Sequence, residues 1–277
     1  MIVVTGATGQ LGRHVVAGLA ELGVKFVAGV RNTAVDLGVE TRELDYNRPE
    51  TIEAALQGAE KVLLISGSEV GQRVPQHTAV VEAAKKAGVQ HLVYTSALHA
   101  DTTELAVAPE HKVTEEIIRA SGIPFTFLRN GWYHENYVDT IKQAAQTGEI
   151  VGAAADGRVA SATRKDFADA AVAVLTQPGH ENKVYELTGD VAWTFPEFAE
   201  EIAKVAGRPV SYRNVSVEEL QQHLTSVGLP PEVAGFVAAL DGNIADGLLG
   251  ITPGDLRGLI GRPTTPVSVT IQEVLNA

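Results

Sequence analysis

Short apolar runs alternate with amphipathic segments through the first half of the chain. The runs are rich in β-branched residues and predict strands at residues 2–5, 25–30, 39–44, 61–65, 91–95 and 124–128. Between them, apolar residues recur at helical spacing, as Leu11, Val15 and Leu19 do in one segment. The predicted helices cover residues 10–22, a segment around Ile52, 75–87 and 114–120. Strands that alternate with helices indicate βαβ units, and therefore an α/β fold with a doubly wound parallel sheet of the Rossmann type.

The pattern changes after about residue 150. A helix at 166–175 and a strand at 184–187 can still belong to the sheet, but the rest of the second half is mostly helical, with a loop expected at 241–250. We therefore predict a Rossmann-type domain over residues 1–150 and a smaller, mainly helical second lobe over residues 151–277. The chain can cross between the two more than once.

A glycine-rich turn directly follows the first strand. Residues 5–12 read Thr-Gly-Ala-Thr-Gly-Gln-Leu-Gly, with glycines at intervals of three between a strand and a helix. Gly6 permits the tight turn, Gly9 lets the backbone approach a pyrophosphate, and Gly12 lets the helix pack on the sheet. The amide groups at the start of the helix would meet the phosphates at its positive end. The residues expected to bind a dinucleotide here are Gly6, Thr8, Gly9, Gln10 and Leu11.

The residue at the end of the second predicted strand indicates whether the dinucleotide carries a 2′-phosphate. An acidic residue there would bond a ribose 2′-hydroxyl, but this chain has Arg31, whose guanidinium can bind a 2′-phosphate with charge-assisted hydrogen bonds. NADPH is therefore the expected cofactor, although Arg31 could also be a solvated surface residue. Asp45 would bond the adenine amino group, and Arg73 is a second candidate for a phosphate or an ordinary cation at a helix start. The residues expected along the nicotinamide side are Ser66, Gly67 and Ser68.

Charge and composition exclude several other classes of protein. The chain has 22 basic and 34 acidic residues and a net charge of −12, which repels nucleic acids and anionic lipids. It has no cysteine, so disulfides, thiolate metal sites and a cysteine nucleophile are excluded. No signal peptide and no run of about 18 apolar residues is present. We expect a cytoplasmic protein that inserts into no membrane and acts on a small molecule.

These motifs resemble those of the NmrA-like family of atypical short-chain dehydrogenase/reductases. More closely, the chain resembles the bacterial NADPH:quinone oxidoreductases of type 2 and the related triphenylmethane reductases. The resemblance covers nearly the whole chain and implies an NADPH-dependent reductase that acts on quinones or similar conjugated acceptors. It is carried by residues 6–12, 64–73, 94–101, 128–133, 160–164 and 184–187.

One departure from the wider superfamily concerns proton transfer. The usual reductase has a tyrosine and a lysine four residues apart on the helix before the sixth strand, and these positions hold Val107 and His111 here. Two interpretations remain. The protein can reduce an acceptor that needs no strong proton donor, such as a quinone, whose reduction gives an oxyanion delocalised over a ring. Alternatively, it binds NADP(H) without turnover and acts as a redox-sensing regulator.

The acceptor is expected beyond the carboxyl ends of the strands, where open α/β sheets bind ligands. Trp132 and Tyr133 could form a wall for a planar, quinone-like ring, or could instead pack the two lobes together. The backbone of Asn130, Gly131 and Trp132 could hold the carboxamide of the nicotinamide. No second nucleotide site is visible, so no flavin is expected, and a homodimer is compatible with these features.

The expected catalytic residues are His111, Ser96 and Tyr133. His111 is the first candidate for a proton donor because the ordinary pKa of histidine lies near neutrality, with solvent as the alternative source. His111 could also be a solvated residue in the first turn of its helix. Ser96 could donate a hydrogen bond to an acceptor oxygen or merely cap its strand. No His-Glu-x-x-His arrangement occurs, so no catalytic metal is expected.

Overall fold

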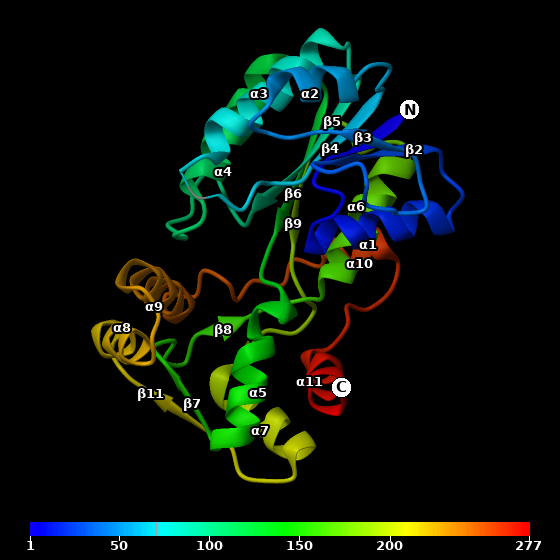
Figure 1. The fold of residues 1–277 in the computed structure, drawn as a ribbon. Coiled ribbons are helices and arrows are strands. Elements are labelled where there is room, and N and C mark those ends of the chain that lie inside the picture. Colours follow the sequence, from blue (N-terminus) through cyan, green and yellow to red (C-terminus); the bar gives the residue numbers. More distant parts are fainter. Residues whose placement is uncertain (70) are drawn as a thin grey trace.

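A parallel sheet lies at the centre of the computed structural model, which describes residues 1–69 and 71–277 (Figure 1). Within these residues the sheet has seven strands in the order β3-β2-β1-β4-β5-β6-β9, and every neighbouring pair is parallel. Its strands are β1 (Ile2–Val4), β2 (Phe26–Val30), β3 (Thr41–Glu43), β4 (Lys61–Leu64), β5 (His91–Ala97), β6 (Phe125–Asn130) and β9 (Lys183–Leu187). The order reverses between β1 and β4, which opens a crevice at their carboxyl ends. The predicted doubly wound fold is confirmed.

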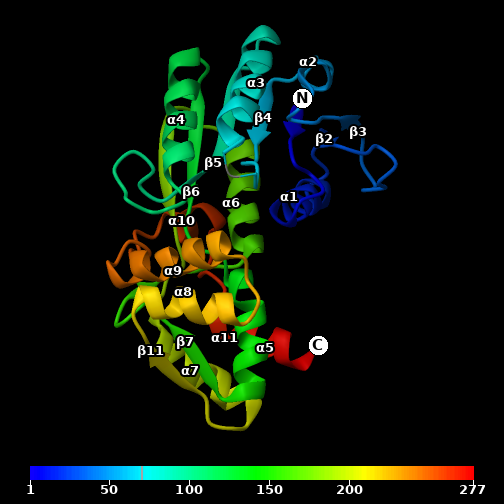
Figure 2. The ribbon, with the colours of Figure 1, turned by 60° about the vertical axis from the view of Figure 1, so that its left-hand side comes forward.

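Helices cover both faces of the sheet (Figures 1 and 2). Successive side chains of a strand point to opposite faces, so Ile2 and Val4 lie on one side and Val3 on the other. All three are buried, which explains why β1 reads as a continuous apolar run. One face carries α1 (Gln10–Glu21), α6 (Arg164–Thr176) and α10 (Asp255–Ile260), and the other carries α2 (Pro49–Ala55), α3 (Arg73–Lys86) and α4 (Pro109–Ser121).

A second lobe lies beyond the carboxyl edge of the sheet (Figure 2). Its core gathers aromatic rings, among which Trp193 and Phe198 stack with their centroids 4.7 Å apart. Two small sheets add to it, one antiparallel (β8 with β10) and one parallel (β7 with β11). Its elements are η1 (His134–Tyr137), α5 (Val138–Thr147), β7 (Glu149–Gly152), β8 (Arg158–Val159), β10 (Trp193–Thr194), α7 (Phe195–Ala206), β11 (Ser211–Asn214), α8 (Val217–Ser226), α9 (Pro231–Ala245) and α11 (Val267–Asn276).

The chain crosses between the sheet domain and the second lobe more than once. Helix α5 precedes residue 150, yet it packs against α7 and α11 in the second lobe. Helix α6 and strand β9 return to the sheet, where α6 packs against α1 and β9 pairs with β6. The short helix α10 then covers α6.

Helix α9 is longer than the sequence pattern predicts. A loop was expected at 241–250, but the helix continues to Ala245, so this expectation is wrong for the first half of that segment. Ile244 is buried in the core of the second lobe and holds the last turn in place.

In the part of the chain that the structure describes, no helix has both the length and the apolar character needed to cross a bilayer.

Four buried histidines, His77, His91, His111 and His134, have pKa values lowered mainly by burial and make the stability of the fold sensitive to acid. Burial is the main cause that lowers the pKa of His77 and of His134 to about 4 and that of His111 to about 3. An unfolded chain binds these protons with pKa values of about 6.5, so below that pH the unfolded state gains protons that the folded state does not. We expect the free energy of unfolding to fall between pH 6.5 and pH 4, by up to about 1.4 kcal/mol per pH unit for each histidine.

Urea unfolding at pH 7, 6 and 5 measures this slope. The variant His111→Asn retains a polar group for the Tyr94 hydroxyl, 2.7 Å from Nδ1 in the wild type, but does not titrate in this range. It should therefore show a flatter pH dependence than the wild type. Equal slopes for the two proteins would contradict the assignment.

Candidate active site

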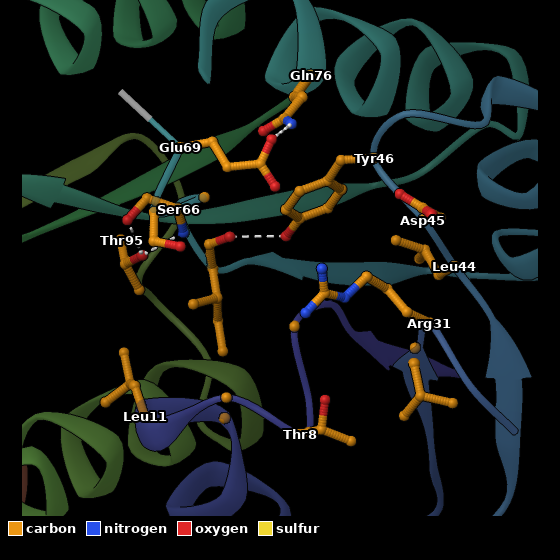
Figure 3. A pocket seen from close by; sticks show the side chains of 18 of the residues that line it. Thr8, Leu11, Arg31, Leu44, Asp45, Tyr46, Ser66, Glu69, Gln76 and Thr95 are labelled. Atoms are coloured by element: carbon orange, nitrogen blue, oxygen red, sulfur yellow. Dashed lines mark hydrogen bonds between the residues drawn. The ribbon is translucent and has the colours of Figure 1, made fainter. Parts of the chain in front are cut away.

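A cavity of about 600 Å³ lies at the carboxyl ends of β1, β2, β3 and β4 (Figure 3). It is bounded by the glycine turn between β1 and α1, by the residues after β2, β3 and β4, and by the start of α3. The predicted residues that the structure brings together here are Gly6, Thr8, Gly9, Gln10, Leu11, Arg31, Asp45, Ser66, Gly67, Ser68, Arg73 and Tyr133. These predicted residues come from six separate segments of the sequence, and all of them line the same cavity.

The glycine turn is shaped for close approach of a ligand. Gly6 has φ +58°, a left-handed conformation that glycine adopts without strain, and its carbonyl accepts a hydrogen bond from Gly9 at 2.9 Å. A Cβ on Gly12 would overlap the carbonyl oxygen of Gly6 and lie 2.9 Å from Cα of Ala7. No side chain caps α1, so its first amide groups stay open towards the cavity. This arrangement fits a diphosphate group.

Residues that the sequence analysis did not single out form the floor of the cavity. The Tyr46 hydroxyl donates to the carbonyl oxygen of Ile65 at 2.6 Å and hydrogen-bonds Oγ1 of Thr5, also at 2.6 Å. The amide of Ser66 donates to Oγ1 of Thr95 at 2.9 Å. Burial raises the pKa of Tyr46, which keeps the phenol neutral. Thr5 and Tyr46 lie shortly after β1 and β3, and this position near the carboxyl ends of parallel strands was the signal that could have identified them.

Two arginines at the cavity have different environments. Arg31 is exposed and points into the cavity (Figure 3), and no hydrogen bond or ion pair ties it to another described residue. Arg73 is half-buried, donates from Nε to the carbonyl of Gly67 at 2.6 Å and pairs with Glu110 at 3.5 Å. The guanidinium of Arg31 is thus available to a phosphate, whereas that of Arg73 is already engaged in the fold.

Another part of the rim carries a polar cluster of Asn47, Glu69 and Gln76, which the sequence analysis also missed. Nε2 of Gln76 donates to Oε2 of Glu69 at 3.0 Å (Figure 3). The same nitrogen donates to Oδ1 of Asn47, also at 3.0 Å. Asp45 lies nearby and accepts a hydrogen bond from the amide of Asn47 at 3.0 Å. These acceptors give the rim a negative character that suits hydroxyl and amino groups of a ligand.

Tyr133 lines the cavity, but its ring is only partly available as a stacking wall. The guanidinium of Arg164 lies over the ring, 4.8 Å from its centroid, and Phe167 packs at a right angle at 5.1 Å. Nδ2 of Asn130 donates to the Tyr133 hydroxyl at 3.2 Å. Burial raises the pKa of Tyr133. Its hydroxyl can therefore donate its own proton towards a ligand while it accepts from Asn130.

The neighbouring residues predicted to hold a carboxamide do not line the cavity. Asn130 is buried, the Gly131 amide donates to the carbonyl of Leu187 at 2.8 Å, and the Trp132 carbonyl accepts from Ala162 at 3.0 Å. The Trp132 ring packs in the core of the second lobe. The structure thus uses this stretch to join β6, β9 and the second lobe, as in the alternative in which the aromatic residues pack the two lobes together.

The position of His111 does not suit the expected role of proton donor. The side chain is buried behind β5, where Nδ1 lies 2.7 Å from the Tyr94 hydroxyl, and it is not among the residues that line the cavity. Burial lowers the pKa of His111 to about 3, so the imidazole is neutral at pH 7. The alternative of a solvated residue in the first helical turn is also wrong, because α4 docks this face against the sheet.

Ser96 also lies away from the cavity, in a buried ionic network. Its hydroxyl donates to Oε1 of Glu115 at 2.6 Å. Arg129 forms a two-pronged pair with the same carboxylate, with distances of 2.9 Å and 2.7 Å, and contacts Glu186 and Asp101. The Ser96 proton is therefore engaged in the fold and does not face an acceptor oxygen. Among the described residues, no group of three or more histidines and carboxylates could hold a metal ion.

Comparisons with known proteins agree with this geometry. The sequence profile of the NmrA-like family matches residues 1–240. The chain is 47% identical to quinone oxidoreductase 2 of Escherichia coli, over 100% of this chain and 99% of that protein. The crystal structure of the E. coli NADPH-dependent quinone oxidoreductase complexed with NADPH superposes with a TM-score of 0.96, 47% identity and full coverage of both chains.

Two further relatives have related names. An NAD(P)H azoreductase of Xenophilus azovorans is 33% identical over 84% of each chain. The structure of the Citrobacter sp. triphenylmethane reductase complexed with NADP(H) has a TM-score of 0.94 and 40% identity, and covers 99% of this chain and 100% of that one. Since the family profile spans most of the sequence and these relatives extend over nearly all of it, this chain belongs to the NmrA-like family.

Proposed function

We propose that this protein is an NADPH-dependent reductase that transfers a hydride to quinones or similar conjugated acceptors. The observation that carries the proposal is the cavity in which an open glycine turn and the guanidinium of Arg31 face the same space. Among residues 1–69 and 71–277, no side chain pairs with this guanidinium. The relatives named above are reductases or oxidoreductases, and two were solved with NADPH or NADP(H).

Different residues at the cavity would bind different parts of the cofactor. The first amides of α1 would bind the diphosphate at the positive end of the helix. Arg31 would bind the 2′-phosphate through charge-assisted hydrogen bonds, and Asp45 would accept from the adenine amino group. The nicotinamide side would be lined by Ser66, Gly67 and Ser68. Because a Cβ on Gly12 would overlap the backbone of Gly6 and Ala7, glycine at this position lets the turn pack closely on the start of α1.

When bound, NADPH supplies a hydride from C4 of its nicotinamide, so that a quinone takes up two electrons and one proton from the cofactor and a second proton to give a hydroquinone. The chain has no tyrosine–lysine pair for this second proton, and His111 is neutral and buried. We therefore assign the proton to solvent. Tyr133 would orient the acceptor through its hydroxyl, which Asn130 holds in place.

The regulator that the sequence analysis left open is the less favoured function. A sensor would bind NADP(H) without turnover, whereas the three relatives named above are reductases or oxidoreductases by name.

An absorbance assay distinguishes the two functions. The purified protein with NADPH and a panel of quinones should lower the absorbance at 340 nm well above the rate of a protein-free blank. The same panel with NADH should react more slowly, because NADH offers no 2′-phosphate to Arg31. Tight NADPH binding by calorimetry with a flat trace at 340 nm would instead favour the sensor.

Two further expectations stay predictions. A homodimer would appear as twice the chain mass of 29.3 kDa in light scattering. A cytoplasmic location would be tested by fractionating the cells of the source organism.

A further inference from the structure

The peptide groups of Gly67 are held from both sides by helix α3. The Gly67 amide donates to Nε2 of His77 at 3.0 Å, and its carbonyl accepts from Nε of Arg73 at 2.6 Å. A Cβ on Gly67 would lie 2.9 Å from Oε1 of Gln76, so glycine also lets α3 come this close. Both polar groups of Gly67 are thus turned towards α3, although the residue lines the cavity.

The hydrogen bonds around His77 determine its tautomer. Thr114 has one hydroxyl proton, which it donates to the carbonyl of Glu110 at 2.8 Å. Its oxygen must therefore accept the hydrogen bond that joins it to Nδ1 of His77 at 3.0 Å. The ring proton is on Nδ1, and Nε2 carries the lone pair that accepts from the Gly67 amide.

The surroundings keep His77 in this neutral form. The side chain is fully buried between α3, α4 and β5, against the rings of Tyr46 and Tyr94. Burial, and next the positive charge of Arg73, lower the pKa of His77 to about 4. At neutral pH the ring therefore accepts one hydrogen bond and donates one, and a protonated ring could not accept from Gly67.

Peptide geometry carries this constraint into the cavity. A trans peptide places its C=O and N–H on opposite sides of the chain. Because the Gly67 amide points to His77, the carbonyl of Ser66 points away from α3. In the same way, because the Gly67 carbonyl points to Arg73, the amide of Ser68 points away from that side chain.

We propose that His77 is a positioning residue for the dinucleotide: by accepting from the Gly67 amide it holds the Ser66 carbonyl where it accepts a hydrogen bond from a hydroxyl or amide donor of NADPH. Thr114 belongs to the same device, since it fixes the ring tautomer. This inference rests on the proposed function, because it takes the residues after β4 to contact the dinucleotide.

Three variants test the device by the affinity for NADPH. His77→Leu removes the acceptor and should raise the Kd and the KM for NADPH about tenfold, while kcat at saturating NADPH changes less than about twofold. His77→Gln offers an amide oxygen near the position of Nε2 and should restore most of the affinity. Thr114→Val preserves shape but frees the ring to carry its proton on Nε2, and should raise the KM in the same direction by about threefold.

Calorimetry with NADPH, steady-state kinetics and thermal unfolding are measured on the same preparations. A purely structural role would lower the unfolding temperature and the active fraction but leave the Kd of the folded protein unchanged, and that result would overturn the inference. Equal affinity of the glutamine and leucine variants would overturn it as well. If His77→Leu does not fold, Thr114→Val decides. A wild type that binds NADPH but does not oxidise it would contradict the proposed function and not this inference.

Discussion

Arg31→Asp is expected to weaken NADPH binding about 100-fold and to leave NADH binding within about threefold of the wild type. The guanidinium of Arg31 faces the cavity and has no partner among the described residues, so a 2′-phosphate would be its natural ligand. Charge-assisted hydrogen bonds contribute about 1.5–3 kcal/mol, and an aspartate adds repulsion of the phosphate. NADH has no such phosphate. Calorimetric titration of the wild type and of Arg31→Asp with NADPH and with NADH measures the ratio of the two affinities.

Two control variants sharpen this result. Arg31→Lys retains the positive charge without the two-pronged geometry and should lose about tenfold in NADPH affinity. Lys142→Asp makes the same change of charge on the exposed side of α5, far from the cavity, and should change neither affinity by more than about twofold. If Arg31→Asp leaves the NADH-to-NADPH ratio unchanged, Arg31 is not part of the site.

Arg129→Met is expected to lower the free energy of unfolding by about 3–5 kcal/mol. The Arg129 side chain, on β6 beside the edge strand β9, is 4% exposed and pairs with Glu115 of α4, which is 3% exposed. Removal of the guanidinium leaves this buried carboxylate without its partner, and a buried charge without a partner is costly. Glu186 and Asp101 both contact Nη1 of Arg129, and both contacts are lost in this variant. Urea unfolding followed by circular dichroism measures the loss.

A double variant shows whether the buried charge is the cause. Arg129→Met combined with Glu115→Gln removes both charges of the pair, and its stability should lie above that of Arg129→Met alone. The amide of the glutamine can still accept from the Ser96 hydroxyl, which lies 2.6 Å from the carboxylate in the wild type. A loss below about 1 kcal/mol for Arg129→Met would show that the network contributes little.

The sequence pattern located most of the sheet because most of its strands are runs of buried apolar residues that can be recognised individually. Strand β3, which reads Thr-Arg-Glu, is an exception. The pattern missed α5, α10 and α11, in which few residues are buried. In α11 the buried residues are Thr270 and Ile271, and in α10 only Leu256 is buried. Such short helices depend on the surfaces they cover, here α6, α5 and α7.

His111 shows how far the role of a single site residue can be predicted from the sequence. Its place near the start of a helix could be read from the sequence, and so could the ordinary pKa of its side chain. The side of the helix that docks against β5 could not, because it depends on Tyr94 and on packing contributed by other segments. Burial then changed a candidate proton donor into a neutral structural group.

The amino acid order alone specified the glycine turn, the arginine after the second strand and the alternation of strands and helices. These depend on residues that are neighbours along the chain, where backbone sterics and periodicity act directly. Folding in three dimensions decided which polar groups face the cavity and which are engaged elsewhere, as with Arg73, Ser96, Tyr46 and His77. Their partners lie on other elements, and a hydrogen bond between distant segments exists only once the layers have packed.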